Sequence, residues 1–549
     1  MKNRPSDAST HLHPDFPGLV HHLASGQISR RAFFRAAASL GFSAATAAAL
    51  TATMTGGAAL MAQRALADTP QKGGRLRIAT VDSSPADRLD PATQDTFTDG
   101  IRSYIVFEKL TEIDPSGKVV PQLAESWSSD PTATVWTFEL RKNVTFHNGK
   151  TLTADDVVYT FTRAINPDTH SQGAVFFKDL DNVKADGANR VVFTLKSPNA
   201  EFATLGSMRW LGILPTGAKD FPKDAIGTGP WKVKDFQPGL TTLYTRNENY
   251  WRNGLPYIDE IESTGIGDES ARLDALLSGE VDMVESINPK AVGRVNQSDG
   301  AKALVVDGGA YTCFPMHSDQ APFNNLDVRQ ALKYSFDRKK FVDLAFDGLG
   351  AIGRDNPIPP SDPFFCKDVP IPTADPDKVK FHLKKAGAEN YAFELHTSDA
   401  NYGGANAAVV AVQLMRETGV NVTVKKDPAD GYWSAVFMKV PWCTSSWTVR
   451  PTAITRIEGG YVTGAPYNEA FWSSPKVDQL VADAKKELDE TKRAALLCEA
   501  QQIISAEGGT VLPVFVPWID AYSTKVKNLK GHPMMFLGMG QWADVWLES

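Results

Sequence analysis

Cysteine is scarce in this chain. The 549 residues include only Cys313, Cys366, Cys443 and Cys498, too few for the disulfide framework of a small secreted domain. One disulfide fits an exported protein, but four cysteines allow three connectivities, so the pairing stays open. The alternative for each of them is a small buried apolar residue.

An excess of basic residues is also absent. The chain has 57 Lys and Arg against 64 Asp and Glu, a formal net charge of -7, which argues against a nucleic-acid-binding surface. After residue 67 no stretch approaches the roughly 18 apolar residues of a transmembrane helix. With 42% hydrophobic residues, the composition is that of a globular protein, and 549 residues are enough for several lobes.

Local enzyme signatures are missing as well. The sequence contains no Gly-x-Ser-x-Gly, no His-Glu-x-x-His and no Cys-x-x-Cys motif, and its glycine pairs complete neither a phosphate loop nor a dinucleotide fingerprint. The histidines after residue 67 are far apart in the sequence. We therefore expect no catalytic residue, no resident metal and no cofactor.

The first 67 residues have the pattern of an export signal. Arg30 and Arg31, followed by Phe33 and Phe34, match the twin-arginine type. An uncharged, alanine-rich stretch at 36–63 leads to the small residues that end at Ala67, which predicts cleavage between Ala67 and Asp68. An uncleaved membrane anchor is the alternative. Since this leader has six Lys and Arg and two Asp, its removal changes the net charge from -7 to -11.

Strand and helix patterns alternate along the rest of the chain. Short apolar or alternating runs predict strands, and Ser, Thr or Asp residues before Pro or apolar periodicity predict helix starts. The predicted strands are 75–80, 135–141, 190–196 and 241–246. The predicted helices start at Thr153, Asp268, Asp375, Ser474 and Thr491, and the last two bury residues up to Leu488 and Ile504, respectively. This mixture predicts an α/β protein.

Three blocks of the sequence then suggest a family. The first comprises 107–118 (FEKLTEIDPSGK), 121–127 (PQLAESW), 136–150 (WTFELRKNVTFHNGK) and 152–159 (LTADDVVY). The second comprises 227–233 (GTGPWKV), 246–251 (RNENYW) and 277–282 (LSGEVD), and the third is 328–337 (VRQALKYSFD). In this order they resemble the family 5 extracellular solute-binding proteins, the dipeptide, oligopeptide and nickel binders of ABC importers.

The resemblance implies a two-lobed clamshell with an extra α/β subdomain inserted in lobe I. Two crossovers would connect the lobes near Asp307–Gly309 and Pro513–Pro517, where the glycines and prolines also fit hinge positions. A ligand would be enclosed between the lobes by hinge closure. The implied boundaries are 1–67 for the signal peptide; 68–111, 212–306 and 517–549 for lobe I; 112–211 for the extra subdomain; and 307–516 for lobe II.

The resemblance also implies where the ligand binds. Peptide-binding relatives usually have Trp-x-x-Asp in the region that starts here at Trp447, and the carboxylate receives the peptide's amino terminus. This chain has Arg450 at the last position of that motif, and a guanidinium suits a carboxylate, phosphate or sulfate. We therefore expect Arg450 to anchor an anionic or carboxylated solute; the alternative is an ion pair with a structural acid. Further ligand-binding candidates are Trp433, Trp447, Tyr461, Asn468 and Tyr402.

The function that follows is that of a periplasmic substrate-binding component of an ABC transporter. It would be exported by the twin-arginine translocase without a lipid anchor, since the leader has no cysteine. It would act as a monomer, bind a small solute, and deliver it to inner-membrane permease subunits with cytoplasmic ATPases. Peptides, metal chelates, opines and glycosides remain open as ligands. The alternatives are an exported hydrolase of peptides or esters and a binding protein that presents ligand to a chemoreceptor.

Overall fold

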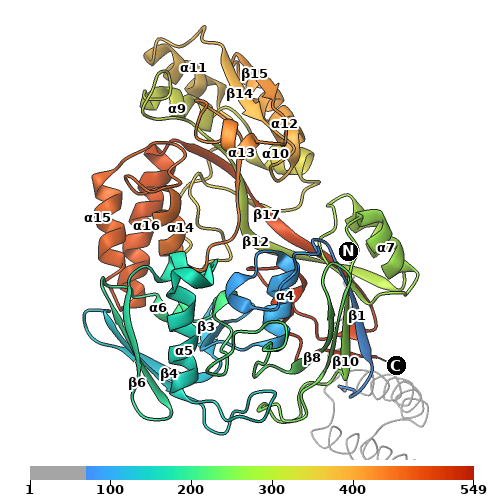
Figure 1. Ribbon diagram of the computed structural model, residues 1–549. Coiled ribbons are helices and arrows are strands. Elements are labelled where there is room, and N and C mark those ends of the chain that lie inside the picture. Colours follow the sequence, from blue (N-terminus) through green and yellow to red (C-terminus); the bar gives the residue numbers. More distant parts are fainter. Residues whose placement is uncertain (1–69, 549) are drawn as a thin grey trace, which may run out of the picture. The chain divides into compact units, whose positions relative to one another are not determined.

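Two long strands organise the described part of the chain, residues 70–548 of a computed structural model (Figure 1). Strands β12 (Ala301–Pro315) and β17 (Thr510–Ser523) pair antiparallel over most of their length. Their register shifts twice, between Val306 and Ala310 and between Thr312 and Phe314. Pro517 and Pro513 of β17 lie opposite these two shifts, because proline has no N–H to donate to the ladder.

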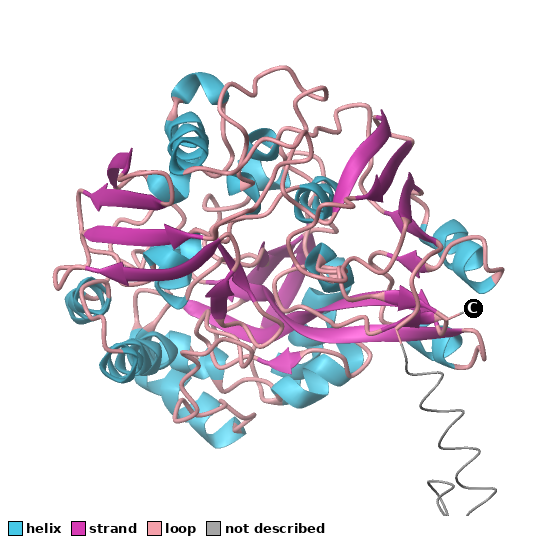
Figure 2. Cartoon of the chain, turned by 90° about the horizontal axis from the view of Figure 1, so that it is seen from below, coloured by secondary structure: helices cyan, strands magenta, loops and turns pink. Residues whose placement is uncertain are grey.

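These strands belong to a nine-stranded mixed sheet. Its order is β16-β12-β17-β11-β1-β10-β9-β8, and β13 also pairs with β17. Strands β1 and β10 are parallel, as are β1 and β11, whereas β10, β9 and β8 are antiparallel neighbours. Helices and strands are mixed throughout the described residues (Figure 2), so the predicted α/β class is confirmed.

Lobe I is built on the half of this sheet that runs from β11 through β1 to β8. Its apolar core joins β1, β10 and α4 to the C-terminal segment that contains Trp542. Its elements are β1 (Arg75–Thr80), the 3₁₀ helix η1 (Pro91–Thr93), α4 (Phe97–Val106), β8 (Trp231–Gln237), β9 (Thr241–Arg246), β10 (Glu260–Gly265), α7 (Glu269–Leu277), β11 (Met283–Val284), α8 (Ala291–Asn296), β18 (Val526–Lys527), η5 (Leu537–Gly540) and β19 (Trp546–Leu547).

The extra subdomain has a four-stranded antiparallel sheet of its own, in the order β4-β5-β7-β6. Alternation along β5 places Trp136, Phe138 and Leu140 in a buried core that also takes Val157 and Phe161 from α5. Its elements are β2 (Thr111–Ile113), β3 (Val119–Pro121), β4 (Ala124–Ser129), β5 (Val135–Leu140), α5 (Ala154–Ile165), η2 (Pro167–Thr169), η3 (Ala174–Phe177), β6 (Leu180–Ala185), β7 (Arg190–Leu195), α6 (Phe202–Leu205) and η4 (Arg209–Leu211).

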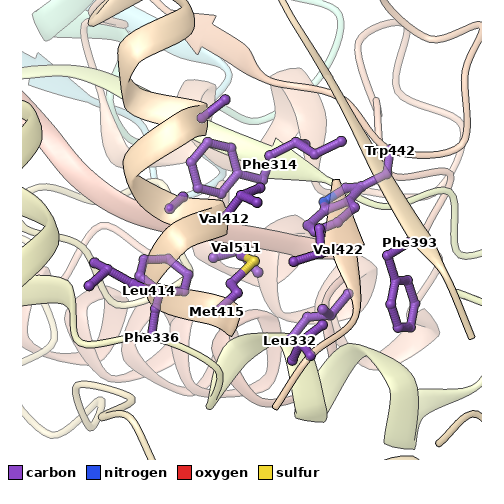
Figure 3. Close-up of a cluster of buried hydrophobic side chains, with 14 of the residues drawn as sticks. Phe314, Leu332, Phe336, Phe393, Val412, Leu414, Met415, Val422, Trp442 and Val511 are labelled. Carbon is purple, nitrogen blue, oxygen red and sulfur yellow. The ribbon is translucent and has the colours of Figure 1, made fainter. Parts of the chain in front are cut away.

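Lobe II has two apolar cores. Figure 3 shows side chains of the first, where Val412 and Met415 of α12 meet Phe314 of β12 and Trp442. The second lies among α14, α15 and α16. The elements are α9 (Leu326–Lys333), α10 (Arg338–Ala345), β13 (Ala351–Ile352), α11 (Pro376–Lys385), β14 (Phe393–Thr397), α12 (Gly404–Glu417), β15 (Val422–Lys426), α13 (Tyr432–Ala435), β16 (Ser445–Trp447), α14 (Ala453–Gly460), α15 (Pro475–Ala484) and α16 (Glu490–Glu507).

The four predicted strands are present within one residue of their expected ends, as β1, β5, β7 and β9. The helix starts after Thr153, Asp268, Asp375 and Ser474 are also confirmed, and Asp156 accepts the backbone N–H of Thr153 at 3.0 Å. The last two predicted helices are partly wrong. Helix α15 ends at Ala484, which leaves Leu488 exposed, and the cap of α16 is Asp489 rather than Thr491, because the Asp489 carboxylate accepts the N–H groups of Thr491 and Lys492.

The two crossovers and domain boundaries expected from the sequence remain predictions. The register shift that spans 307–309 falls on the first expected crossover, and the two prolines of β17 bound the second. No helix within residues 70–548 has both the length and the hydropathy that crossing a bilayer requires. Arg30, Arg31, Ala67 and Asp68 of the expected signal lie outside the described residues.

The structure resolves which cysteines pair. Cys366, in the segment after β13, forms a disulfide with Cys498 of α16, and the two are separated by 132 residues in sequence. Cys313 and Cys443 are free and buried, and burial raises the pKa of both thiols. Thiol reactivity requires an exposed thiolate, so these two are shielded in the folded state.

The Cys366–Cys498 bond should stabilise lobe II. We expect the double variant Cys366→Ala/Cys498→Ala to lose about 2–5 kcal/mol of unfolding free energy, because the bond closes a long loop in the unfolded chain. Thermal unfolding with and without dithiothreitol measures the effect. The reductant should lower the melting temperature of the wild type but not of the variant, and equal sensitivity would contradict the assignment. An aromatic disulfide reagent should titrate no thiol in the native protein and two after denaturation.

Candidate ligand-binding site between the lobes

A cavity of about 420 Å³ lies where lobe I, the extra subdomain and lobe II meet. Its volume falls within the roughly 300–1,000 Å³ of small-molecule sites. Lobe I lines it with Asp82, Trp518 and the start of α4, the extra subdomain with Ser207–Trp210, and lobe II with Thr448–Pro451. Since all three parts line this cavity, a change in the angle between the lobes would change its shape.

Arg450 reaches the cavity from the loop between β16 and α14. Strand β16 pairs with β12, with Trp447 opposite Tyr311. The chain then leaves the sheet, and α14 begins after Thr452, whose hydroxyl accepts the N–H of Thr455 at 3.1 Å. Arg450 lies outside any helix or strand, just ahead of α14, and Pro451 disfavours helical geometry at the residue before it.

The Arg450 guanidinium has no ion-pair partner among residues 70–548. Its carbon lies 5.7 Å from the centre of the Trp447 ring, within cation–π distance. Arg456, one helical turn into α14, has Asp362 as its partner at 3.6 Å. Arg450 is therefore a half-buried cation whose hydrogen-bond donors are available to a ligand.

The lobe I side of the cavity carries the opposite charge. The carboxylate of Asp82, just after β1, accepts the backbone N–H groups of Phe97 (2.8 Å) and Thr98 (2.9 Å) and the hydroxyl of Thr98. These donors belong to the first turn of α4, whose dipole favours a negative charge at that end. The exposed Asp95 lines the same side.

A second arginine lines the cavity but is occupied. The Arg209 guanidinium donates to the carbonyl oxygens of Thr96 and Asp95, both at 2.9 Å. Its carbon also lies 4.8 Å from the centre of the Trp210 ring. Arg209 therefore holds the extra subdomain against the start of α4 and keeps only its buried Nε without a partner. No donor of Arg450 is bound by another group of residues 70–548, so its whole guanidinium is available.

Between the charges the wall is apolar and aromatic. The Phe97 ring meets Trp518 edge-on at 5.6 Å, and Trp518 donates its indole N–H to the carbonyl of Pro533 at 2.9 Å. Met208, Met534, Met535 and Met539 line the cavity as well. Methionine is flexible and polarisable, so it adapts to ligand surfaces of different shape.

A buried carboxyl group fixes Trp447 beneath Arg450. Oε1 of Glu469 accepts the indole N–H of Trp447 at 2.9 Å and the thiol of Cys313 at 3.3 Å. Burial raises the pKa of Glu469, which favours the neutral acid. The ring of Trp447 stacks on Tyr311 at 6.0 Å. Trp447 thus forms a rigid support for Arg450, although it does not itself line the cavity.

The other residues predicted from the sequence lie away from this cavity. Trp433 is 44% exposed on α13 and packs against Tyr432 and Phe437. Tyr461 is buried in the core of α14–α16. The Asn468 amide donates to the carbonyls of Val462 and Trp472, a structural role. The half-buried Tyr402 accepts the Thr312 hydroxyl with its backbone carbonyl.

Several cavity residues were not singled out from the sequence. Asp82 and Phe97 lie more than 400 residues before Trp518 and Met535 in the sequence, and the four carry no shared motif. An aspartate just after a predicted strand is the one weak signal, since ligands of open α/β sheets bind at strand ends. The rest depend on long-range packing that sequence periodicity does not encode.

Ionisable groups also meet at the joint beside this cavity. Glu201 of the extra subdomain accepts the N–H of Ile454, in the first turn of α14, at 3.3 Å. Asp362 and Arg456 of lobe II line the same small pocket. Arg456 also donates to the carbonyl of Gly309 in β12 at 3.1 Å. A Cβ at position 309 would lie 2.7 Å from that guanidinium, so glycine permits the contact.

Burial dominates the titration of this joint. Burial, with a smaller contribution from the neighbouring Asp362, raises the pKa of Glu201 to about 7. It also raises the pKa of Asp362, against the attraction of Arg456. The Thr452 hydroxyl, the Ile454 N–H and Arg493 favour the charged form of Glu201 but do not offset the desolvation.

The described residues contain one cluster of metal-ligating side chains, Cys366, Asp368 and Cys498. Both cysteines are in the disulfide, so neither supplies a thiolate.

Comparison with known proteins identifies the family. Residues 118–453 match the model of the bacterial extracellular solute-binding proteins, family 5. The chain belongs to this family. Proteins of family 5 bind small solutes and deliver them to ABC permeases, so the predicted family and its general function are confirmed.

Two characterised members of family 5 and one solved structure illustrate the similarity. Glutathione-binding protein GsiB of Pectobacterium atrosepticum is 28% identical over 435 residues, 75% of this chain and 82% of that protein. Di/tripeptide-binding protein 1 of Pseudomonas aeruginosa is 25% identical over 502 residues, 82% of this chain and 90% of the relative. HbpA2 from Haemophilus parasuis superposes with a TM-score of 0.77 at 23% identity, covering 87% of this chain and all of that one. The predicted two-lobed fold is thereby confirmed.

The hydrogen bond from Trp447 to Glu469, which holds the Trp447 ring next to Arg450, should stabilise the folded protein. We expect Glu469→Leu to lower the unfolding free energy by about 1–3 kcal/mol, because it leaves the buried indole N–H of Trp447 without an acceptor. Glu469→Gln keeps an uncharged acceptor and should cost less. Chemical denaturation and near-ultraviolet circular dichroism test both, with Trp447→Phe as the reference for the dichroism signal. Equal stability of the Leu and Gln variants would contradict this role.

Glu201 should make stability depend on pH. Its folded pKa is raised to about 7, whereas an unfolded glutamate titrates near 4.3. Between these values the folded state holds the proton that the unfolded state has lost, so stability falls as pH rises from about 4.5 to 7. Glu201→Gln should therefore raise the melting temperature at pH 8 more than at pH 4.5. Equal shifts at both pH values would contradict the assignment.

Proposed function

We propose that this chain is the exported receptor of an ABC importer and that it binds a small anionic or carboxylated organic solute. The observation that carries the ligand class is Arg450, a cation that lines the cavity between the lobes and has no carboxylate partner among residues 70–548. Desolvating an unpaired guanidinium is costly. A ligand that brings its own anion removes that cost when the lobes close.

The chemistry of Arg450 selects the anion. A planar guanidinium gives two parallel N–H donors to a carboxylate or phosphate oxygen pair. The cation–π contact with Trp447 and the bond from Trp447 to Glu469 hold that plane in place. Preorganisation of this kind raises affinity, because less side-chain entropy is lost on binding.

The relatives favour carboxylated ligands. One is named a glutathione-binding protein and another a di/tripeptide-binding protein, and both names denote molecules with free carboxylates. Within this class we place peptides first and keep opines as an open possibility. Glycosides and metal chelates without a free anion fit Arg450 less well.

Transport and export complete the proposal. The chain leaves the cytoplasm through the twin-arginine translocase, is cleaved after Ala67, and works as a periplasmic monomer without a lipid anchor. It binds its solute without converting it and presents it to permease subunits. No observation favours a hydrolase or a binding protein that presents its ligand to a chemoreceptor.

Arg450 provides the direct test. We expect thermal-shift screening of glutathione, di- and tripeptides, opines, sugars and nickel chelates to raise the melting temperature with carboxylated compounds. For each hit, Arg450→Gln and Arg450→Ala should weaken binding about tenfold or more in calorimetric titration. The apo melting temperature should stay close to that of the wild type, since the guanidinium has no protein carboxylate to lose.

Arg294→Gln is a matched control, because it removes one arginine from an exposed ion pair with Asp274. Full affinity in the Arg450 variants would contradict the proposal. So would recovery of a chemically converted ligand, which would indicate an enzyme.

A further inference from the structure

Lobe I and lobe II contribute opposite charges to the cavity wall. We propose that the solute is a zwitterion: Arg450 of lobe II receives its anionic group, and Asp82 and Asp95 of lobe I receive a cationic group. This inference rests on the proposed function, because it assumes that the transported solute occupies this cavity. It adds the opposite charge and the two residues that recognise it.

Asp82 is placed to accept one more donor. Two backbone N–H groups and one hydroxyl occupy three of the roughly four acceptor positions of its carboxylate. No Lys or Arg within residues 70–548 forms a direct ion pair with the Asp82 or Asp95 carboxylate, although the nearby Arg209 guanidinium attracts both charges while it donates to backbone carbonyls. The donors from α4 fix the direction of Asp82, and the cavity side is left for an ammonium or guanidinium.

Two further acids lie behind Asp82. Strands β1, β11 and β17 are neighbours in the sheet, and Asp82, Glu285 and Asp520 lie at or near their ends. Glu285 Oε2 accepts the N–H of Val81 at 3.1 Å, directly beside Asp82, and its other oxygen has no partner in the described structure. The backbone N–H groups of Ser286 and Leu537 donate to Asp520.

These two buried acids favour their neutral forms. Burial, with smaller contributions from the charges of Asp82 and Asp520, raises the pKa of Glu285 to about 8 against the attraction of Arg272. Burial raises the pKa of Asp520 to about 7. The negative charge of the lobe I wall therefore rests on Asp82 and Asp95, which line the cavity and attract the cationic group of a ligand.

The space between the charges suits an apolar body. Phe97, Trp518 and the four methionines line the cavity together with Asp82, Asp95 and Arg450. Apolar side chains contribute affinity by burial, while the charges at the two ends set orientation. A peptide with free termini and an N-carboxyalkyl amino acid share this chemistry.

A ligand-modification cycle tests the inference. The probes are trileucine in four forms (free, N-acetylated, C-amidated and doubly blocked), with N-(1-carboxyethyl)leucine and its N-acetyl derivative as the non-peptide arm. The proteins are wild type, Asp82→Asn, Asp95→Asn and Arg450→Gln. Asp299→Asn is the control, because Asp299 is exposed and does not line the cavity. Calorimetry measures each dissociation constant.

We expect N-acetylation to weaken binding to wild type about tenfold or more in the arm that binds. That penalty should shrink to about threefold or less in Asp82→Asn, and partly in Asp95→Asn, but persist in Arg450→Gln and in the control. C-amidation should show the reverse dependence, losing its effect in Arg450→Gln. If Asp82→Asn does not fold, Asp95→Asn gives the result, because the Asp95 side chain makes no bond among residues 70–548.

Equal binding of the free and N-acetylated probes to wild type would overturn this inference and leave the anion site of the proposed function standing. A penalty that persists in both aspartate variants would overturn it as well. Failure of every probe, together with glutathione, to bind would contradict the carboxylated ligand of the proposed function itself. The arm that binds distinguishes a peptide from a non-peptide zwitterion.

Discussion

The pairing of β12 with β17 is the constraint on which the rest of this structure depends. The two strands run side by side from the sheet of lobe I into lobe II, and each belongs to the buried cores of both. Their register breaks where β17 has prolines and where β12 has Gly308 and Gly309. A continuous ladder would be stiff, and an interrupted one bends where hydrogen bonds are missing. The cavity lies beside this crossing, with Trp518 of β17 in its wall.

Charge is distributed around the crossing in an uneven way. Most buried cations are satisfied by carbonyls or carboxylates, as Arg338 is by Asp355 at 2.7 Å and Arg209 is by two backbone carbonyls. Arg450 differs, since it has an aromatic ring below it and no acid beside it among the described residues. Under the proposed function a ligand neutralises this cation, and binding then depends on the ligand's charge.

Three buried acids make the stability of this structure depend on pH. Glu201, Glu285 and Asp520 all have pKa values raised mainly by burial, and they lie in the extra subdomain, at the β11 strand end and on β17, respectively. Burying each acid costs the least free energy when the acid is protonated, so the contacts that bury them are strongest in mildly acidic conditions.

Local sequence patterns predicted the positions of several strands and helices correctly. The four predicted strands and the helix starts after Thr153, Asp268, Asp375 and Ser474 were found, because alternation and capping act over a few residues. Errors occurred where a neighbouring residue offered a better cap, as Asp489 does for α16. The motif blocks, which lie in order between residues 107 and 337, also led to the right family.

The sequence by itself determined the α/β class, the family and the presence of an arginine, Arg450, three residues after Trp447. Only the tertiary structure decided that Cys366 pairs with Cys498, that Trp447 supports Arg450 from below, and that Asp82, Trp518 and the methionines share its cavity. It also shows that Trp433, Tyr461 and Asn468 do not line that cavity. The physical reason is range: turns and caps depend on neighbours in sequence, whereas a binding cavity depends on contacts between segments hundreds of residues apart, which no local period encodes.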